Sequence, residues 1–240
     1  EGTMDVAAFV AAHTQGSSGS AVVAETAPAT PKLQVPRDYT EHNVQSLPAY
    51  LAESAPAAMR ELGTTNAEDL TCVEMGDGNL NLVFIVTNVK SPDQKVIVKQ
   101  SLPYVRCVGE SWPLTLERSY FEYKALVAEK EACSEFVPTV YFFSKPNGLM
   151  VMQYLAAPII ILRKGLIQGI KYPTMATDMG TFCAKTLFKT SGFKLSPTEI
   201  RKQVEFWSKN VEMCALTEQV VFTEPYMEAS NNHWTKPFLN

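Results

Sequence analysis

Residues 74–81 read Glu-Met-Gly-Asp-Gly-Asn-Leu-Asn, and residues 96–100 read Val-Ile-Val-Lys-Gln; these two stretches decide the fold. The first is a glycine-rich turn between two short apolar segments, and the second is an apolar segment that leads to Lys99. A sheet can hold nucleotide phosphates in this way, because backbone N–H groups of the turn face the phosphates while a cation reaches them from a neighbouring strand. The pattern predicts a nucleotide-binding sheet.

The turn consists of residues that let the backbone come close to a phosphate. Gly76 and Gly78 have no Cβ, and Asp77 and Asn79 tolerate positive φ angles. Taken alone, the turn is also compatible with a plain hairpin, because Asp-Gly is a common hairpin signal. The side-chain amides of Asn79 and Asn81 favour phosphate binding, since they can donate hydrogen bonds to phosphate oxygens or to the loop backbone.

A lysine and a glutamate follow the turn in an informative order. Lys99 ends an apolar strand, so its ammonium group points either to a cleft, where it needs a carboxylate partner, or along the surface to water. Glu122 lies in the next helix and can supply that carboxylate. The alternative for Glu122 is a surface pair with Arg118, one helical turn earlier. The order of turn, strand lysine and helix glutamate favours the cleft pair.

The composition argues against several classes of function. The chain has 240 residues and a net charge of −4, so it has no general attraction to nucleic acid or to an anionic membrane. No apolar run approaches the ~20 residues that a membrane span requires. The five cysteines are widely spaced and form no C-x-x-C pair, which is typical of free thiols in a reducing compartment and predicts a cytoplasmic protein.

Three regions follow one another along the chain. Residues 1–38 are rich in Ala, Ser, Thr, Gly and Pro, which predicts a disordered tail or linker. Residues 39–152 carry the strand patterns and the glycine-rich turn, and we expect them to form an N-terminal nucleotide-binding lobe. Helical patterns dominate residues 153–240, which predicts the start of a helical C-terminal lobe.

Hydrophobic periodicity and turn residues predict the individual elements. We expect helices over 50–62, 116–130 and 175–187 and from Ser196 onward, strands over 70–74, 80–87, 95–100, 136–144 and 149–155, and turns at 76–78, 91–94 and 145–148. In the helix over 116–130, the stripe of Leu116, Tyr120, Tyr123 and Val127 is expected to face the core. The fold class is therefore α+β: a two-lobed protein-kinase-like fold with a five-stranded antiparallel N-lobe and an incomplete helical C-lobe.

The sequence resembles the S-methyl-5-thioribose kinase family, a branch of the kinase fold related to aminoglycoside phosphotransferases. The resemblance rests on residues 74–81, on residues 97–100, and above all on residues 108–115, Val-Gly-Glu-Ser-Trp-Pro-Leu-Thr. Residues 163–167, 180–188 and 222–226 also look like this family. The similarity extends from about residue 39 to the end of the chain.

The resemblance implies transfer of the γ-phosphate of ATP to the 1-hydroxyl of methylthioribose, with Mg²⁺, in methionine salvage. The implied ATP-binding residues are Gly76, Asp77, Gly78, Asn79 and Asn81 in the phosphate loop, Lys99 with its brace Glu122, and Gln153, Tyr154 and Leu155 at the adenine. Trp112 is placed in a loop near the cleft, where it either faces the substrate or simply packs that loop. The implied partners are ATP and methylthioribose, and a homodimer is compatible with the sequence.

Two departures from the family pattern bear on activity. Gln153 stands where the family usually has an acidic residue. The catalytic H-G-D-x-H segment and the metal-binding D-x-E segment do not occur in the 240 residues, so we expect them beyond Asn240 and assign no catalytic or metal-binding residue here. The alternatives are a kinase of another small alcohol, such as choline or an aminoglycoside, and a non-catalytic nucleotide-binding module.

Overall fold

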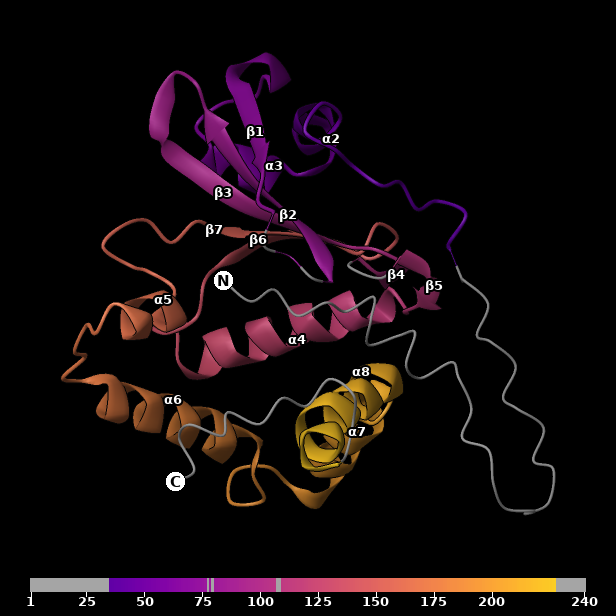
Figure 1. Ribbon diagram of the computed structural model, residues 1–240, viewed down its shortest axis with the longest axis vertical. Coiled ribbons are helices and arrows are strands. Elements are labelled where there is room, and N and C mark those ends of the chain that lie inside the picture. The colour runs from indigo at the N-terminus through magenta and orange to yellow at the C-terminus, as the bar shows by residue number, and fades with distance from the viewer. Residues whose placement is uncertain (1–34, 77, 79, 107–108, 228–240) are drawn as a thin grey trace.

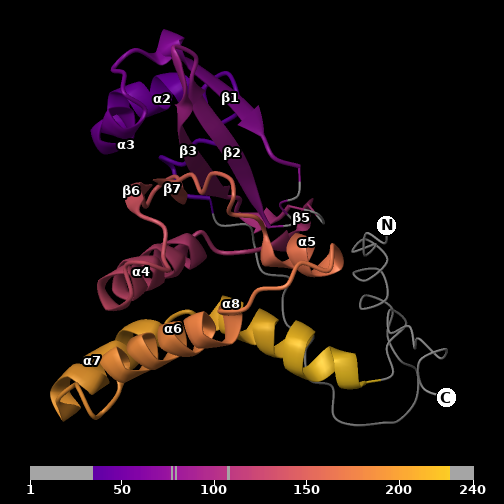
Figure 2. The same cartoon turned by 90° about the vertical axis from the view of Figure 1, so that its left-hand side faces the viewer.

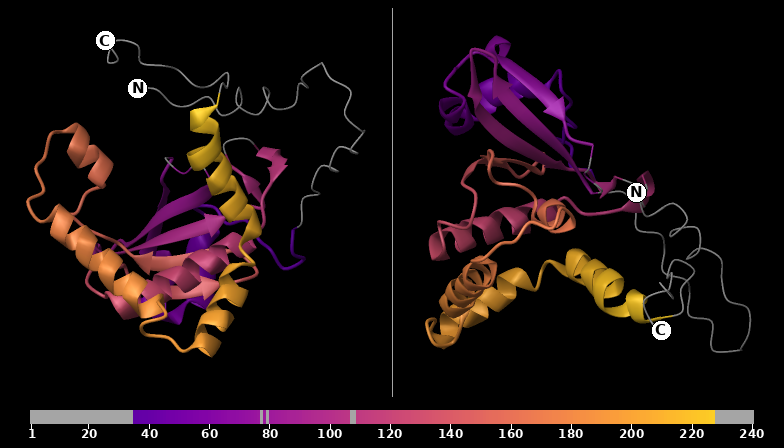
Figure 3. Two further views of the ribbon diagram at one scale, coloured as in Figure 1. Left: turned by 90° about the horizontal axis from the view of Figure 1, so that it is seen from below. Right: turned by 60° about the vertical axis from the view of Figure 1, so that its left-hand side comes forward.

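The computed structural model describes residues 35–76, 78, 80–106 and 109–227, and Figure 1 shows their arrangement. Most of the predicted tail lies outside the described residues, as do Asp77 and Asn79. The described part is built in layers: two short helices, a sheet, the helix α4, and a group of C-terminal helices on the side of α4 that faces away from the sheet (Figures 2 and 3). None of the helices in this part of the chain has the length and apolar character that a bilayer crossing requires.

The sheet has five strands in the order β1-β2-β3-β7-β6, and every neighbouring pair is antiparallel. The strands are β1 (Leu70–Glu74), β2 (Asn81–Asn88), β3 (Ser91–Ser101), β6 (Val140–Ser144) and β7 (Leu149–Gln153). The predicted five-stranded antiparallel sheet is confirmed. A second, two-stranded sheet, β4 (Tyr104–Val105) with β5 (Gly109–Pro113), was not predicted, and it contains Trp112.

Alternation along β2 and β3 gives the sheet two different faces. Phe84 and Val86 on β2, and Val96 and Val98 on β3, are fully buried on one face. This face packs against α2 (Leu47–Ser54) and α3 (Pro56–Glu61), which bury their own leucines and Met59 in the same core. Residues of the opposite parity over 81–87 and 95–99, including Lys99, are only half-buried. Successive side chains on a strand point to opposite faces, so the second face is left for α4 (Glu117–Ala132) and a site.

The helix predicted over 50–62 is two helices, with the break at Ala55. Ala55 has φ −122° and ψ 62°, outside the helical region. Pro56 explains the break, because proline has no N–H to donate and its ring disfavours the helical conformation of the preceding residue. Gly63 follows the second helix with φ +67°, a conformation that suits glycine.

Three strand boundaries differ from the prediction. β3 begins at Ser91 rather than at residue 95, because the hairpin turn lies at residues 89–90 and is closed by the Asn88 side chain, whose Oδ1 accepts from Lys90 N at 2.9 Å. β6 begins at Val140, since Pro138 cannot donate to a ladder and Lys130 Nζ holds the preceding turn through Val137 O at 2.6 Å. β7 ends at Gln153, where its pairing with β3 stops.

The apolar stripe predicted for the helix after β5 is only partly correct. Leu116 is buried, but within α4 the buried residues are Arg118, Ser119 and Phe121, while Tyr120, Tyr123 and Val127 are half-buried. The helix is covered on two sides rather than one, so a single stripe does not describe it. On one side the ring of Tyr123 stacks on Phe143 of β6, with 4.6 Å between the ring centroids. On the other, Phe121 faces Phe206 of α7 (Pro197–Trp207) at 5.3 Å.

Helices dominate after β7, as predicted. They are α5 (Leu162–Ile167), α6 (Met175–Thr190), α7 and α8 (Val211–Thr217), followed by a π-helical segment (Glu218–Thr223) and a short 3₁₀ turn (Glu224–Tyr226). α7 begins where the sequence predicts it, and its N-cap Ser196 forms a reciprocal capping box with Glu199. Ion pairs join α6 to the end of α4, one of them Lys189 to Glu131 at 3.0 Å. The division into two lobes at residues 152–155 stays a prediction.

Phe84→Ala tests the buried face of the sheet. Phe84 is fully buried, so its truncation should lower the free energy of unfolding by about 3–5 kcal/mol, as is usual for a core phenylalanine. Val73→Ala on β1 is the control, since Val73 is 58% exposed and its truncation should have a small effect. Urea unfolding followed by circular dichroism measures both, and equal losses would contradict the assignment of the core face.

Candidate functional site

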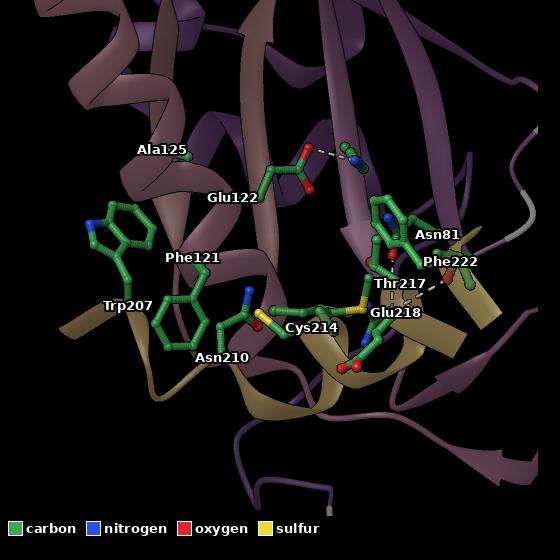
Figure 4. Close-up of a pocket in the computed structure, with 14 residues that line it drawn as sticks. Asn81, Phe121, Glu122, Ala125, Trp207, Asn210, Cys214, Thr217, Glu218 and Phe222 are labelled. Atoms are coloured by element: carbon green, nitrogen blue, oxygen red, sulfur yellow. Dashed lines mark hydrogen bonds and ion pairs between the residues drawn. The ribbon is translucent and has the colours of Figure 1, made fainter. Parts of the chain in front are cut away.

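The second face of the sheet borders a cavity of about 740 Å³ (Figure 4). Asn81 and Lys99 line it from the sheet, and Arg118, Phe121 and Glu122 line it from α4. The opposite wall comes from the chain between Trp207 and Phe222, which includes α8 and the π-helical segment. The cavity thus lies between the antiparallel sheet and the C-terminal helices, with Lys99, Arg118 and Glu122 on one side and Glu218 on the other.

Lys99 and Glu122 form an ion pair in this cavity. Lys99 Nζ lies 2.6 Å from Glu122 Oε1, and the side chains are 28% and 37% exposed (Figure 4). The pairing of Glu122 with Arg118 is therefore wrong, and the predicted strand-to-helix pair is present. A pair this accessible to solvent contributes only about 0–1 kcal/mol to stability. Its main effect is to hold the ammonium group at a defined place beside the cavity.

Arg118 is a second cation in the cavity wall, and the sequence analysis missed its role. Its guanidinium donates to Asn81 Oδ1 at 2.9 Å and to Leu80 O at 3.3 Å, both at the end of the glycine-rich turn. It also donates to Thr115 O at 2.8 Å, just before α4. Burial lowers the pKa of Arg118 to about 10, so the group is still charged at neutral pH. The sequence did contain a signal for this role. Arg118 lies four residues before Glu122, so the two side chains share one face of the helix.

The glycine-rich turn is described at Gly76 and Gly78. It connects β1 to β2 through residues 75–80, so it closes a hairpin and is longer than the two-residue turns that Asp-Gly favours. A Cβ on Gly78 would lie 2.3 Å from Asn81 O, so only glycine fits this backbone. Arg106, which the sequence analysis also missed, pairs with Glu74 and makes a long hydrogen bond of 3.4 Å to Gly78 O.

The residues predicted to hold adenine lie outside the lining of this cavity. Gln153 is engaged within the sheet: its backbone N–H donates to Thr139 O at 2.8 Å, and its Oε1 accepts from Thr139 N at 3.2 Å. The Lys95 ammonium group lies over the Tyr154 ring, with Nζ 5.5 Å from the ring centroid. Leu155 is 45% exposed. Adenine binding by these residues stays a prediction, and the Gln153 side-chain oxygen already has a partner.

Trp112 lies in β5 and is half-buried, outside the cavity lining, so neither of its two predicted roles is decided. Within the described ranges, no three His, Cys, Asp or Glu side chains gather as metal ligands. No residue of these ranges is therefore assigned to Mg²⁺.

A five-stranded antiparallel sheet, a helix that pairs its glutamate with a strand lysine, and a following group of helices define a protein of the two-lobed, kinase-like fold class. No family model matches the sequence. The chain is 50% identical over 195 residues to methylthioribose kinase 1 of Oryza sativa subsp. japonica, which covers 81% of the chain and 44% of that relative. By sequence, the chain is similar to methylthioribose kinases over more than three quarters of its own length.

Bacterial relatives agree with the rice protein. The methylthioribose kinase of Escherichia coli O45:K1 is 41% identical over 207 residues, which covers 86% of the chain and 48% of the relative. That of Exiguobacterium sibiricum is 41% identical over 184 residues, which covers 77% of the chain and 46% of the relative. The chain thus spans a little under half the length of these curated relatives.

Lys99→Met tests whether the paired lysine acts on a nucleotide. In the full-length protein, we expect turnover of ATP to fall by about 10²–10³-fold, the usual effect of losing one electrostatic contact to a reacting phosphate. Thermal unfolding should be nearly unchanged, because the pair is exposed. Lys202→Met, an exposed lysine of α7, is the control. Unchanged turnover in the Lys99 variant would remove this residue from the site.

Glu122→Gln tests the contribution of the Glu122 carboxylate separately from that of Lys99. Glutamine has the size of glutamate but no charge. Lys99 is therefore still present in the variant, but its ammonium group is no longer held in place by an ion pair. We expect turnover to fall by about tenfold, which corresponds to about 1.4 kcal/mol and is a smaller loss than in Lys99→Met. Steady-state kinetics of the two variants and their double variant would show the coupling. A Glu122→Gln rate equal to wild type would mean that Lys99 needs no brace.

Proposed function

We propose that the full-length protein transfers the γ-phosphate of ATP to the 1-hydroxyl of S-methyl-5-thio-D-ribose, a step of methionine salvage. The Lys99–Glu122 pair, 2.6 Å apart beside the glycine-rich turn, carries the proposal, because this arrangement suits nucleotide phosphates. The substrate follows from the relatives, which are named methylthioribose kinases. A cytoplasmic location is part of the proposal and fits the free thiols of Cys72, Cys133, Cys183 and Cys214.

The residues of this chain would contribute mainly position and charge. Lys99 would contact phosphate oxygens and offset their negative charge, while Glu122 holds the ammonium group in place. Gly76 and Gly78 let the backbone of the turn approach the phosphates, and Asn81 adds a side-chain amide. Phosphoryl transfer depends largely on such positioning and electrostatic stabilisation. Mg²⁺ would neutralise phosphate charge, and none of the described residues is assigned to hold it or to orient the sugar hydroxyl.

Incubation of the full-length protein with ATP, Mg²⁺ and methylthioribose tests the proposal. We expect formation of ADP that depends on methylthioribose, measured by a coupled assay, and a new phosphate ester at the 1-position, measured by ³¹P NMR. Choline and an aminoglycoside are tested as alternative acceptors under the same conditions. The Lys99→Met variant is assayed beside the wild-type protein. A loss of ADP formation in the variant shows that the activity belongs to this cavity.

The alternatives give different results in the same assay. Phosphorylation of choline or the aminoglycoside in preference to methylthioribose would indicate a kinase of another small alcohol and overturn the proposed substrate. Binding of ATP without ADP formation for any acceptor would indicate a non-catalytic nucleotide-binding module. Both outcomes would leave the fold assignment intact, since the fold rests on the sheet and helix arrangement.

A further inference from the structure

Helix α4 contacts two neighbouring strands of the sheet through two residues one turn apart. Glu122 pairs with Lys99 on β3, and Arg118 donates to Asn81 at the start of β2. Asn81 and Lys99 both line the cavity, and their strands pair so that Asn81 lies opposite Ser101 and Val83 opposite Lys99. One helix face therefore orients two polar side chains that border the same space.

The contacts of Arg118 are unusual for a buried arginine. The residue is 6% exposed, and its guanidinium donates to the backbone carbonyls of Leu80, Leu114 and Thr115 and to the amide oxygen of Asn81. Within the described residues, its Nε has no hydrogen-bond partner. Glu122 and Glu212 influence its charge, but Glu122 pairs with Lys99 and Glu212 accepts from the backbone N–H of Thr115. A buried guanidinium is costly, so its placement here calls for a role.

The chemistry of the two groups decides how the Asn81 amide lies. A guanidinium has only donors, so the end of the amide that faces Arg118 at 2.9 Å must be the oxygen. The amino end, with two donors, is then directed away from the guanidinium. If Asn81 turned over, its N–H groups would face those of Arg118, which is unfavourable. Arg118 thereby holds the amide in one of its two orientations.

We infer that Arg118 is a positioning residue for the phosphates of a bound nucleotide: it orients the Asn81 side chain so that the amide presents its donors to them. The inference rests on the proposed function in that the ligand is a nucleotide. Arg118 acts through Asn81 and through the end of the glycine-rich turn, where it also holds Leu80 O. Lys99 and Arg118 bring two positive charges to the cavity wall, and Glu122 and Glu218 bring two negative ones, so the preference for a phosphate rests on the directed donors rather than on net charge.

Asn81→Asp removes the amide donors and keeps an acceptor for Arg118. The carboxylate still accepts a hydrogen bond from Arg118, so the contact is kept and the protein should unfold at the wild-type temperature or above. Both donors are lost and a negative charge is added, so the affinity for ATP and ADP should fall tenfold or more. Calorimetric titration of the full-length protein with ATP, ADP and adenosine measures this effect. Adenosine binding should be unchanged, because adenosine has no phosphate.

A double-mutant cycle tests whether Arg118 acts through Asn81. Arg118→Met and Asn81→Ala should each lower the affinity for ATP tenfold or more, and the double variant should bind no more weakly than Asn81→Ala alone. Residues that act as a unit give non-additive effects. Arg201→Met, an exposed arginine of α7, is the matched control and should bind ATP as wild type does. If Arg118→Met does not fold, Arg118→Gln takes its place in the cycle, because an amide has both donors and acceptors and no longer fixes Asn81 in one orientation.

Three results would overturn the inference, and they are distinguishable. Wild-type affinity for ATP in Asn81→Asp would show that the amide donors do not contact phosphates. Additive losses in the cycle, or a lower unfolding temperature with unchanged affinity in Arg118→Met, would show that Arg118 acts independently of Asn81 or only supports the fold. Absence of ATP binding by the wild-type protein would overturn the proposed function and this inference together.

Discussion

Alternation of side chains along β3 is the constraint on which the rest of the structure depends. Lys99 and Gln100 are neighbours, so they point to opposite faces of the sheet. Gln100 is fully buried, accepts from His42 N at 2.9 Å, and donates to Thr40 O at 2.8 Å and Asn147 O at 3.1 Å. It thereby fastens the segment before α2 and the β6–β7 turn to the strand. Because this anchor fixes the strand, Lys99 has a defined position on the other face.

The second requirement is a helix held firmly across that other face. Aromatic rings hold α4 on both sides, with Tyr123 stacked on Phe143 and Phe121 in contact with Phe206 and Trp207. Aromatic contacts of this kind contribute about 0.5–1.5 kcal/mol each beyond the area they bury. The Lys99–Glu122 pair is more exposed and adds little to stability. The apolar contacts therefore place α4, and the polar residues of its cavity side can serve a ligand.

The strands were predictable from the sequence wherever one face is buried. In β2, the alternation of Leu82, Phe84 and Val86 is unambiguous, and the strand lies where it was expected. The prediction failed where a local backbone rule competed with periodicity, as at Pro56, which divides a predicted helix, and at Pro138, which delays β6. It also failed for α4, because a helix packed on two sides has no single apolar stripe. The small β4–β5 sheet has too few residues for a periodic signal.

By itself, the sequence determined the class of fold, the similarity to methylthioribose kinases, and the pair Lys99 and Glu122, since residue type and order along the chain are enough to suggest these. The tertiary structure decided which partners the charged residues take. Arg118 was expected to be at most a surface partner of Glu122, yet it lies beneath the end of the glycine-rich turn and bonds to Asn81. Gln153, predicted at the adenine, accepts a hydrogen bond from Thr139 N, and its contact with a ligand stays a prediction. The physical reason is that a hydrogen bond depends on distances of about 3 Å between segments far apart in the chain, and packing of the whole sheet and helix sets those distances.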